Sequence, residues 1–150
     1  MNKEIERKFL VSFFDEALAY DKIEIRQGYV FSNEGKVVRI RTWNDKGYIT
    51  VKYRISKLTR NEFEYEIPKA DADIMLDDLC NNAILSKTRY LVNDNNKKWE
   101  IDVFHGKNEG LILAEIELNS EDEEFILPSF AGREVTSEAK YSNHNLAKGI

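Results

Sequence analysis

The feature that most constrains this chain is an alternation of apolar and charged residues that recurs along most of its length. In the first segment, Glu4, Glu6 and Lys8 alternate with Ile5 and Phe9. Alternate residues of a strand share a face, so a period of two predicts β-strands. We expect eight strands, over Lys3–Val11, Ile23–Phe31, Lys36–Trp43, Gly47–Arg54, Asn61–Ile67, Leu85–Val92, Lys98–Phe104 and Leu111–Leu118.

Short turn-forming segments and a few helical patterns connect these strands. Asn33–Gly35, Asn44–Gly47 and Asn93–Asn96 are rich in turn residues and short enough for hairpins. A helix is predicted over Asp71–Ala83 because its apolar residues share one face. Those residues are Ala72, Met75, Leu76, Leu79 and Ala83. Short helices are also expected after Ser120–Glu123 and over Ser137–Lys148. The sequence predicts one domain, 1–150, of the α+β class with a mostly antiparallel sheet.

The charges on the polar faces of these strands are sorted by sign. Acids occupy the first, fifth, seventh and eighth strands, and the third, fourth and sixth carry bases. The acidic positions include Glu4, Glu6, Glu62, Glu64, Glu100, Asp102, Glu115 and Glu117. The basic positions are Arg39, Arg41, Lys52, Lys87 and Arg89, with Lys8 on the first strand. A solvated sheet face is the alternative, but such faces usually mix Ser, Thr, Gln and Lys. Random solubilising charge would not sort in this way. If the sheet closes into a barrel with this face inward, the barrel encloses an acidic region and a basic region.

An enclosed set of charges of this size restricts the ligand. Buried charge is costly unless it is paired or occupied. Arginine and lysine suit phosphate oxygens, and carboxylates suit Mg²⁺ or Mn²⁺. A single Glu-x-Glu pair is a weak signal. Glu4-x-Glu6-x-Lys8 followed by Arg39-x-Arg41, Lys87-x-Arg89 and Glu115-x-Glu117 is a strong one, and it predicts a polyphosphate bound with a divalent cation.

These same residues resemble the CYTH superfamily, whose members are also called triphosphate tunnel metalloenzymes. The opening Glu4-Ile5-Glu6-Arg7-Lys8 is similar to the Glu-x-Glu-x-Lys signature of that family. The resemblance extends to Gln27-Gly28-Tyr29, Val38–Arg41, Thr50–Lys52, Lys87–Tyr90, Glu100–Phe104, Ala114–Glu117, Gly132–Thr136 and Lys140–Asn143. The last segment resembles the helix that plugs the tunnel in short bacterial members. The chain departs from the pattern at Arg133, where an acid is expected, and at Arg54, a further base near the end of the fourth strand. Neither position touches the central signature, and the expected effect of Arg54 is on substrate preference at the tunnel mouth.

The resemblance implies a closed, tunnel-shaped barrel of eight antiparallel strands with a C-terminal plug helix. It also implies that the protein hydrolyses a triphosphate inside this tunnel with Mg²⁺ or Mn²⁺. Its implied phosphate-binding set is Lys8, Arg39, Arg41, Lys52, Lys87 and Arg89. The implied main metal ligands are Glu4, Glu6 and Glu117, with Glu62, Glu64, Asp102 and Glu115 placing a second ion or the attacking water. Crowding by cations and a bond to Tyr29 would let Lys8 act as a base, although phosphate contact alone would also explain Lys8.

Several alternatives stay open at this point. Short members of the family resemble inorganic triphosphatases, whereas relatives act as adenylate cyclases or as nucleoside or thiamine triphosphatases. A non-catalytic polyphosphate-binding module is a further alternative. His105 and His144 are expected at the surface. The net charge of −5 argues against nucleic acid, and the absence of a long apolar run argues against a membrane span.

Features outside the charged face predict location and assembly. The only cysteine, Cys80, cannot form an internal disulfide, which fits a reducing cytoplasm. Its place in an apolar helical pattern predicts that it is a small buried residue. The highly charged start is unlike a secretory leader. With the charges inward, the apolar residues must face outward, and such a surface predicts a homodimer. They are Ile5, Phe9, Val38, Ile40, Val51, Phe63, Tyr65, Trp99, Ile101, Ile116 and Leu118.

Overall fold

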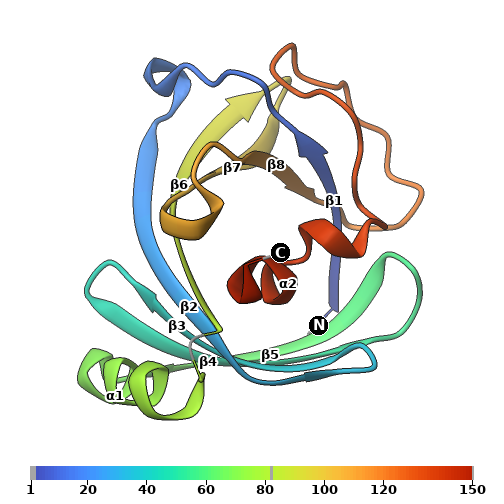
Figure 1. The fold of residues 1–150 in the computed structure, drawn as a ribbon. Coiled ribbons are helices and arrows are strands. Elements are labelled where there is room, and N and C mark those ends of the chain that lie inside the picture. Colours follow the sequence, from blue (N-terminus) through green and yellow to red (C-terminus); the bar gives the residue numbers. More distant parts are fainter. Residues whose placement is uncertain (1–2, 82, 150) are drawn as a thin grey trace.

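A computed structural model describes residues 3–81 and 83–149 and shows a closed barrel of antiparallel strands (Figure 1). The strands are β1 (Lys3–Leu10), β2 (Asp21–Asn33), β3 (Lys36–Trp43), β4 (Lys46–Arg54), β5 (Thr59–Ile67), β6 (Ile84–Asp94), β7 (Lys97–Phe104) and β8 (Ile112–Glu117). Around the barrel they run in the order β1-β5-β4-β3-β2-β6-β7-β8. The predicted eight-stranded antiparallel barrel is therefore confirmed.

The hairpin turns explain why neighbouring strands in sequence pair so closely. Glu34 and Gly35 join β2 to β3, and Asn95 and Asn96 join β6 to β7, all with positive φ. Two-residue turns of this kind match the twist of antiparallel strands and favour Asn and Gly. Asn44, with φ of 56°, opens the turn between β3 and β4. The turn residues identified in the sequence thus set the register of three hairpins.

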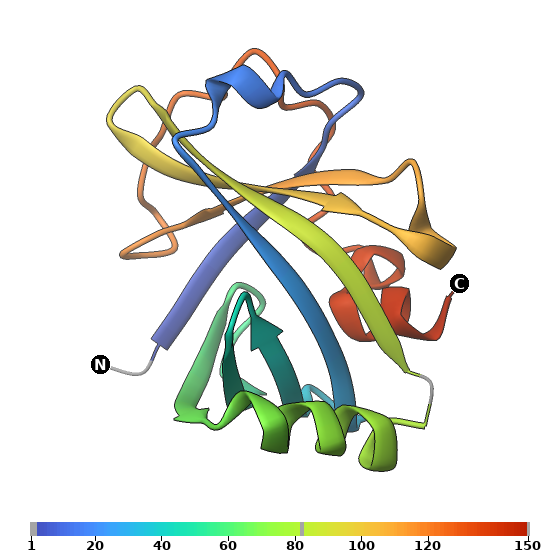
Figure 2. The ribbon, with the colours of Figure 1, turned by 90° about the vertical axis from the view of Figure 1, so that its left-hand side faces the viewer.

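Helix α1 (Lys69–Leu79) packs on the outer face of β2, β3 and β4 (Figure 2). Ala72 and Leu76 are buried against Ile40. The helix ends before the predicted Ala83 because Asn81 adopts a left-handed conformation with φ of 47°. Asn82 lies outside the described residues.

Gly28 allows this helix end to approach the barrel. A Cβ at Gly28 would lie 2.8 Å from Cys80 Sγ, so only glycine leaves room for the buried cysteine. The prediction that Cys80 is a small buried residue is confirmed. Leu79 was wrongly assigned to the buried face of the helix, because its side chain remains 48% exposed.

An irregular segment, 119–133, covers the outside of β1, β7 and β8. Phe125 and Phe130 pack on Trp99, which is fully buried. The helix expected after Ser120–Glu123 is wrong, because Glu121 and Asp122 form a turn. The Glu121 carboxylate accepts hydrogen bonds from Ser56 and Thr59, so the turn is fixed to the loop between β4 and β5.

The C-terminal residues enter one end of the barrel. The predicted helix 137–148 is divided into η3 (Ala139–Tyr141) and α2 (Asn143–Lys148), because Ser142 is extended and caps α2. Leu146 and Ala147 of α2 pack against a cluster of apolar side chains at this end of the barrel: Leu85, Phe104, Leu113 and Val135. Asn108 Nδ2 donates to the Leu146 carbonyl at 2.8 Å. The expected plug helix is confirmed, and Figure 1 shows α2 within the ring of strands.

Two further short helices complete the chain, η1 (Glu16–Leu18) and η2 (Gly106–Asn108). Of the apolar residues expected to face outward, most are buried beneath α1 and the covering segments. The remaining four, Val38, Val51, Phe63 and Tyr65, lie on β3 to β5, and the first three are neighbours in register. Phe31 of β2 lies opposite Val38 and extends this uncovered row. Within the described residues, no helix is long and apolar enough to cross a bilayer.

Candidate functional site in the barrel interior

The barrel encloses a belt of charged side chains. Alternation on each strand directs them inward, and they approach one another across strands that are not neighbours. Buried members of the belt are Lys8, Arg39, Arg41, Lys52, Lys87, Arg89, Asp102 and Glu115. Three further members are partly buried, Glu4, Glu6 and Glu62, and two are exposed, Glu64 and Glu117. All of the positions predicted from the alternating pattern therefore lie on the expected face.

One group joins β3, β4 and β5 around Glu64. Arg41 Nη2 donates to Glu64 Oε2 at 2.9 Å, and Arg39 Nη2 lies 3.4 Å from the same oxygen. Thr50 Oγ1 donates to it at 2.6 Å. Burial, together with the positive charges of Arg39 and Arg89, lowers the pKa of Arg41 to about 10. The Nε atoms of Arg39 and Arg41 are buried without partners within the described residues, so both guanidinium groups retain donors for a further acceptor.

A second group joins β6 and β7 around Asp102. Lys87 Nζ donates to Asp102 Oδ2 at 2.7 Å, and Arg89 Nε and Nη2 donate to its two oxygens at 2.8 and 3.0 Å. Burial lowers the pKa of Lys87 to about 8 despite the opposing effect of Asp102. The two cations hold the pKa of Asp102 well below its usual range. Asp102 thus orients two predicted phosphate ligands, and its oxygens are occupied by them.

Lys52 and Lys8 connect the two halves of the belt. Lys52 Nζ donates to the Glu4 oxygens at 3.1 and 3.2 Å and lies 3.4 Å from Glu62. Lys8 Nζ donates to the Tyr141 carbonyl at 3.0 Å and lies 3.5 Å from Glu115.

Tyr29 does not bond Lys8 in the way the sequence suggested. The Tyr29 hydroxyl instead accepts a hydrogen bond from Gln27 at 2.8 Å. Among the hydrogen bonds of residues 3–81 and 83–149, no Lys8–Tyr29 bond is present. The neighbours of the Lys8 ammonium are instead two acceptors, the Tyr141 carbonyl and the Glu115 carboxylate.

Negative charge is least compensated around Glu117. Burial raises the pKa of Glu117 to about 7, assisted by four neighbouring carboxylates, those of Glu4, Glu62, Glu100 and Glu6. Burial also raises the pKa of Glu100. In the described part of the chain, no three His, Cys, Asp or Glu side chains are gathered closely enough to hold a metal ion. Several carboxylates are held by lysine or arginine instead, yet the surplus of hard oxygen donors at Glu117 fits a divalent cation.

Replacing Glu117 by glutamine is expected to stabilise the metal-free protein at pH 8 more than at pH 5. An acid whose folded pKa rises from 4.5 to about 7 binds its proton more tightly in the folded state, so the stability of the wild type falls as pH rises across that window. Glutamine carries no such charge. Thermal unfolding in EDTA at both pH values measures the effect, with Glu66→Gln, at an exposed position near the end of β5, as the control. An equal difference in Tm at both pH values would contradict it.

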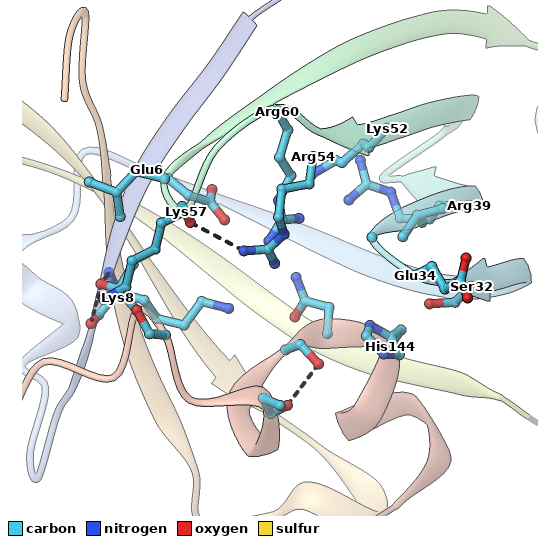
Figure 3. A pocket seen from close by; sticks show the side chains of 18 of the residues that line it. Glu6, Lys8, Ser32, Glu34, Arg39, Lys52, Arg54, Lys57, Arg60 and His144 are labelled. Atoms are coloured by element: carbon cyan, nitrogen blue, oxygen red, sulfur yellow. Dashed lines mark hydrogen bonds between the residues drawn. The ribbon is translucent and has the colours of Figure 1, made fainter.

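A cavity of about 240 Å³ opens from this belt at the end of the barrel that holds α2. Glu6, Lys8, Arg39 and Lys52 line its inner part. Figure 3 shows further side chains around the same cavity, from three strands, the connections between them and α2. Ser32 and Arg54 lie at the ends of β2 and β4, and Arg60 lies at the start of β5. Glu34 belongs to the β2–β3 turn, Lys57 to the β4–β5 loop and His144 to α2.

Sequence patterns missed part of this cavity. His144, expected at the surface, lines the cavity and lies edge-to-face with Tyr29 at 6.1 Å. Burial lowers the pKa of His144, with nearby cations adding to the effect. Arg60 has no role in the sequence analysis because the fifth strand is predicted to begin at Asn61, two residues after its observed start at Thr59. Arg54 is connected with the tunnel mouth in the sequence only through its departure from the family pattern, and Lys57 lies in a loop without periodicity.

Comparisons with known proteins agree with this architecture. The model of the CYTH domain family matches residues 2–149. The chain is 45% identical to an inorganic triphosphatase of Acetivibrio thermocellus, covering 99% of this chain and 95% of the relative. It is 34% identical to an inorganic triphosphatase of Nitrosomonas europaea, covering 98% of each. The crystal structure of the inorganic triphosphatase NE1496 superimposes with a TM-score of 0.71 at 33% identity, covering 98% of this chain and 95% of that one. The resemblance drawn from the sequence is confirmed.

Proposed function

The chain belongs to the CYTH family, and we propose that it hydrolyses inorganic triphosphate to pyrophosphate and phosphate within the barrel, with Mg²⁺ or Mn²⁺ as cofactor. One observation carries the proposal: six inward lysine and arginine side chains face a set of carboxylates inside one closed barrel. The set of six is Lys8, Arg39, Arg41, Lys52, Lys87 and Arg89. Two relatives that span nearly the whole chain are inorganic triphosphatases, which supports the same activity.

The bases would bind and orient the substrate. Phosphoryl transfer passes through a transition state with charge spread over the phosphate oxygens, so catalysis depends on positioning and electrostatic stabilisation. The free donors of Arg39 and Arg41 suit these oxygens, and substrate binding would draw Arg41 away from Glu64. We assign Lys8 to phosphate contact, since its ammonium lies among hydrogen-bond acceptors. Tyr29 would line the substrate cavity beside it.

The carboxylates would hold the cation and the attacking water. Glu4, Glu6 and Glu117 are proposed as the main metal ligands because negative charge accumulates where they meet. When bound, a divalent cation would neutralise charge that develops on the phosphate oxygens. Glu62, Glu64 and Glu115 would place a second ion or the water. Asp102 belonged to that group in the sequence analysis, and we now propose that it positions Lys87 and Arg89 instead.

Phosphate release from tripolyphosphate tests the proposal directly. We expect turnover with Mg²⁺ or Mn²⁺, loss of turnover in EDTA, and recovery when the metal is restored. The cause is the dense charge of the substrate, which the belt neutralises only together with a cation. Full turnover in EDTA would contradict the metal requirement. Binding of tripolyphosphate without turnover in any metal would favour the non-catalytic polyphosphate-binding module.

Substrate choice separates this activity from the other activities of the family. The cavity lining is dominated by charged and small polar side chains, and a nucleoside would require a site for its base. We therefore expect tripolyphosphate to be hydrolysed faster than ATP or thiamine triphosphate under matched conditions. Faster turnover of ATP or thiamine triphosphate, or formation of cyclic AMP from ATP, would assign the protein to one of the alternative activities.

We also infer that residues 1–150 act as one cytoplasmic domain that forms a homodimer and binds neither nucleic acid nor membranes. The uncovered apolar row on β2 to β5 supports the dimer. The row includes Phe31, which is 48% exposed, and Val51, which is 38% exposed. Sedimentation equilibrium at micromolar concentration measures the assembly, and a single species of 17.5 kDa would contradict it.

A further inference from the structure

We propose that Arg54, Lys57 and Arg60 form an outer anion subsite that binds the distal phosphoryl group of linear polyphosphates longer than tripolyphosphate. This outer subsite lies at the mouth of the cavity that holds the inner phosphate ligands. The proposal rests on the proposed function and deepens it, because it names the class of substrate that the outer subsite would bind more tightly. None of the three residues belongs to the inner charged belt.

Strand geometry places Arg54 one step outward from an inner phosphate ligand. Lys52 and Arg54 are two residues apart on β4, so both side chains point into the barrel. Lys52 is buried, whereas Arg54 is exposed at the end of the strand. A polyphosphate chain leaving Lys52 toward solvent would therefore meet Arg54 next.

Arg54 is held in place rather than left to move freely. A Cβ on Gly35 would lie 3.2 Å from Arg54 Cβ and 3.7 Å from its Nε, so the β2–β3 turn packs closely along the arginine side chain. Arg54 Nη1 also donates to the Lys57 carbonyl at 3.3 Å. A guanidinium held in this way loses less entropy when it binds an anion.

Arg60 faces Arg54 directly across the β4–β5 pair. Like charges directly opposite each other on neighbouring strands are destabilising. Among the ion pairs of the described residues, none joins Arg54, Lys57 or Arg60 to an acid. Lys52 engages the carboxylate of Glu4, the residue opposite Arg60 on β1. Figure 3 shows Arg54 and Arg60 extending from the barrel wall toward the cavity.

The charge of the whole cavity favours an elongated anion. Its lining contains six lysine and arginine residues and three glutamates. One of those glutamates, Glu138, is paired with Arg133. The inner ligands Lys8 and Arg39 and the three residues of the outer subsite line the same cavity. Tripolyphosphate seated on the inner ligands would leave that subsite to a fourth phosphoryl group.

The test compares hydrolysis of tripolyphosphate and tetrapolyphosphate with Mg²⁺. In the double variant Arg54→Ala/Arg60→Ala, we expect the ratio of kcat/KM for tetrapolyphosphate over tripolyphosphate to fall by about fivefold or more, from the loss of charge-assisted hydrogen bonds. The control is Lys22→Ala/Lys46→Ala, which removes the same charge from exposed positions at the opposite ends of β2 and β4. The control should keep the wild-type ratio.

Three outcomes would overturn the outer subsite. An equal loss of kcat/KM for both substrates would show that the three cations only attract polyanions in general. A similar fall in the control would do the same. A loss confined to ATP, measured in parallel, would place a nucleoside at the mouth.

A binding measurement separates this inference from the proposed function. Calorimetric titration of metal-free protein with the two polyphosphates needs no turnover. We expect tetrapolyphosphate to bind more tightly than tripolyphosphate. This margin in Kd should shrink in the double variant and persist in the control. If the wild type hydrolyses neither substrate, the proposed hydrolysis fails while this margin still decides the subsite. If tripolyphosphate is hydrolysed and the margin is the same in all three proteins, the subsite alone fails.

Discussion

Replacing Asp102 by asparagine is expected to lower the free energy of unfolding by about 3–5 kcal/mol, because it leaves two buried cations without their shared carboxylate. Asp102 is 1% exposed and binds Lys87 at 2.7 Å and Arg89 at 2.8 and 3.0 Å. For a chain of this size, the change corresponds to a fall in Tm on the order of 6–20 °C. Differential scanning calorimetry measures it.

The same variant should separate substrate binding from turnover. Without Asp102, Lys87 and Arg89 are freed for an added anion, so tripolyphosphate in EDTA should raise the Tm of the variant more than that of the wild type. The two cations would also lose their fixed orientation, and kcat should fall. A positioning role therefore predicts a lower kcat without a matching rise in KM.

Asp73→Asn provides the matched control. Asp73 also accepts contacts from two basic side chains, Lys69 at 3.0 Å and Arg26 at 3.8 Å, but both pairs are exposed to solvent. Exposed ion pairs contribute about 0–1 kcal/mol, so this variant should unfold almost as the wild type does. An equally small change in Asp102→Asn, with unaltered kcat, would show that Asp102 neither stabilises nor positions the basic pair.

The Asp102 carboxylate should also make the stability of the protein depend on pH. The pKa of Asp102 is held below its ordinary value by Arg89 and Lys87. An acid with a depressed folded pKa contributes stability that is present above its unfolded pKa and is lost as pH falls toward the folded value. The difference in Tm between wild type and Asp102→Asn should therefore narrow in acid.

The sequence predicted the barrel well because its strands are two-sided. Each strand separates a charged face from an apolar one, and a shift of one residue would exchange them, so the pattern identifies both the strand and its orientation. The predicted and observed limits of β3, Lys36–Trp43, are identical. The close approach of α1 to the barrel was less predictable because it depends on contact between Cys80 and Gly28, which are distant in sequence.

The covering segment and the partners inside the barrel depend on tertiary structure. Phe125 and Phe130 follow no period that would place them on Trp99. Alternation identified which side chains face inward, but the pairing of Arg41 with Glu64 requires the register of three strands. For the same reason, sequence alone could not pair Asp102 with Lys87 and Arg89.

Substituting Arg41 by alanine is expected to have the largest effect on catalysis. Its guanidinium is buried, lies 2.9 Å from Glu64, and stacks over Trp43 at 4.8 Å. Loss of a buried charged partner typically costs about 2–5 kcal/mol, which corresponds to a fall of roughly 30- to 5,000-fold in kcat/KM. Phosphate release over a range of tripolyphosphate concentrations gives kcat and KM separately.

Two comparisons define what Arg41 contributes. Arg41→Lys keeps the charge but loses the paired donors of the guanidinium, so it should recover only part of the activity. Arg26→Ala removes an exposed arginine from the outer face, where it contacts Asp77 at 3.0 Å, and should leave kcat/KM within about twofold, as expected for an exposed ion pair. If Arg41→Ala and Arg26→Ala lowered kcat/KM equally and slightly, the inward charges would behave as an ordinary solvated sheet face. A large loss in Arg41→Ala alone, with only partial rescue by lysine, would place the substrate on the basic wall of the barrel.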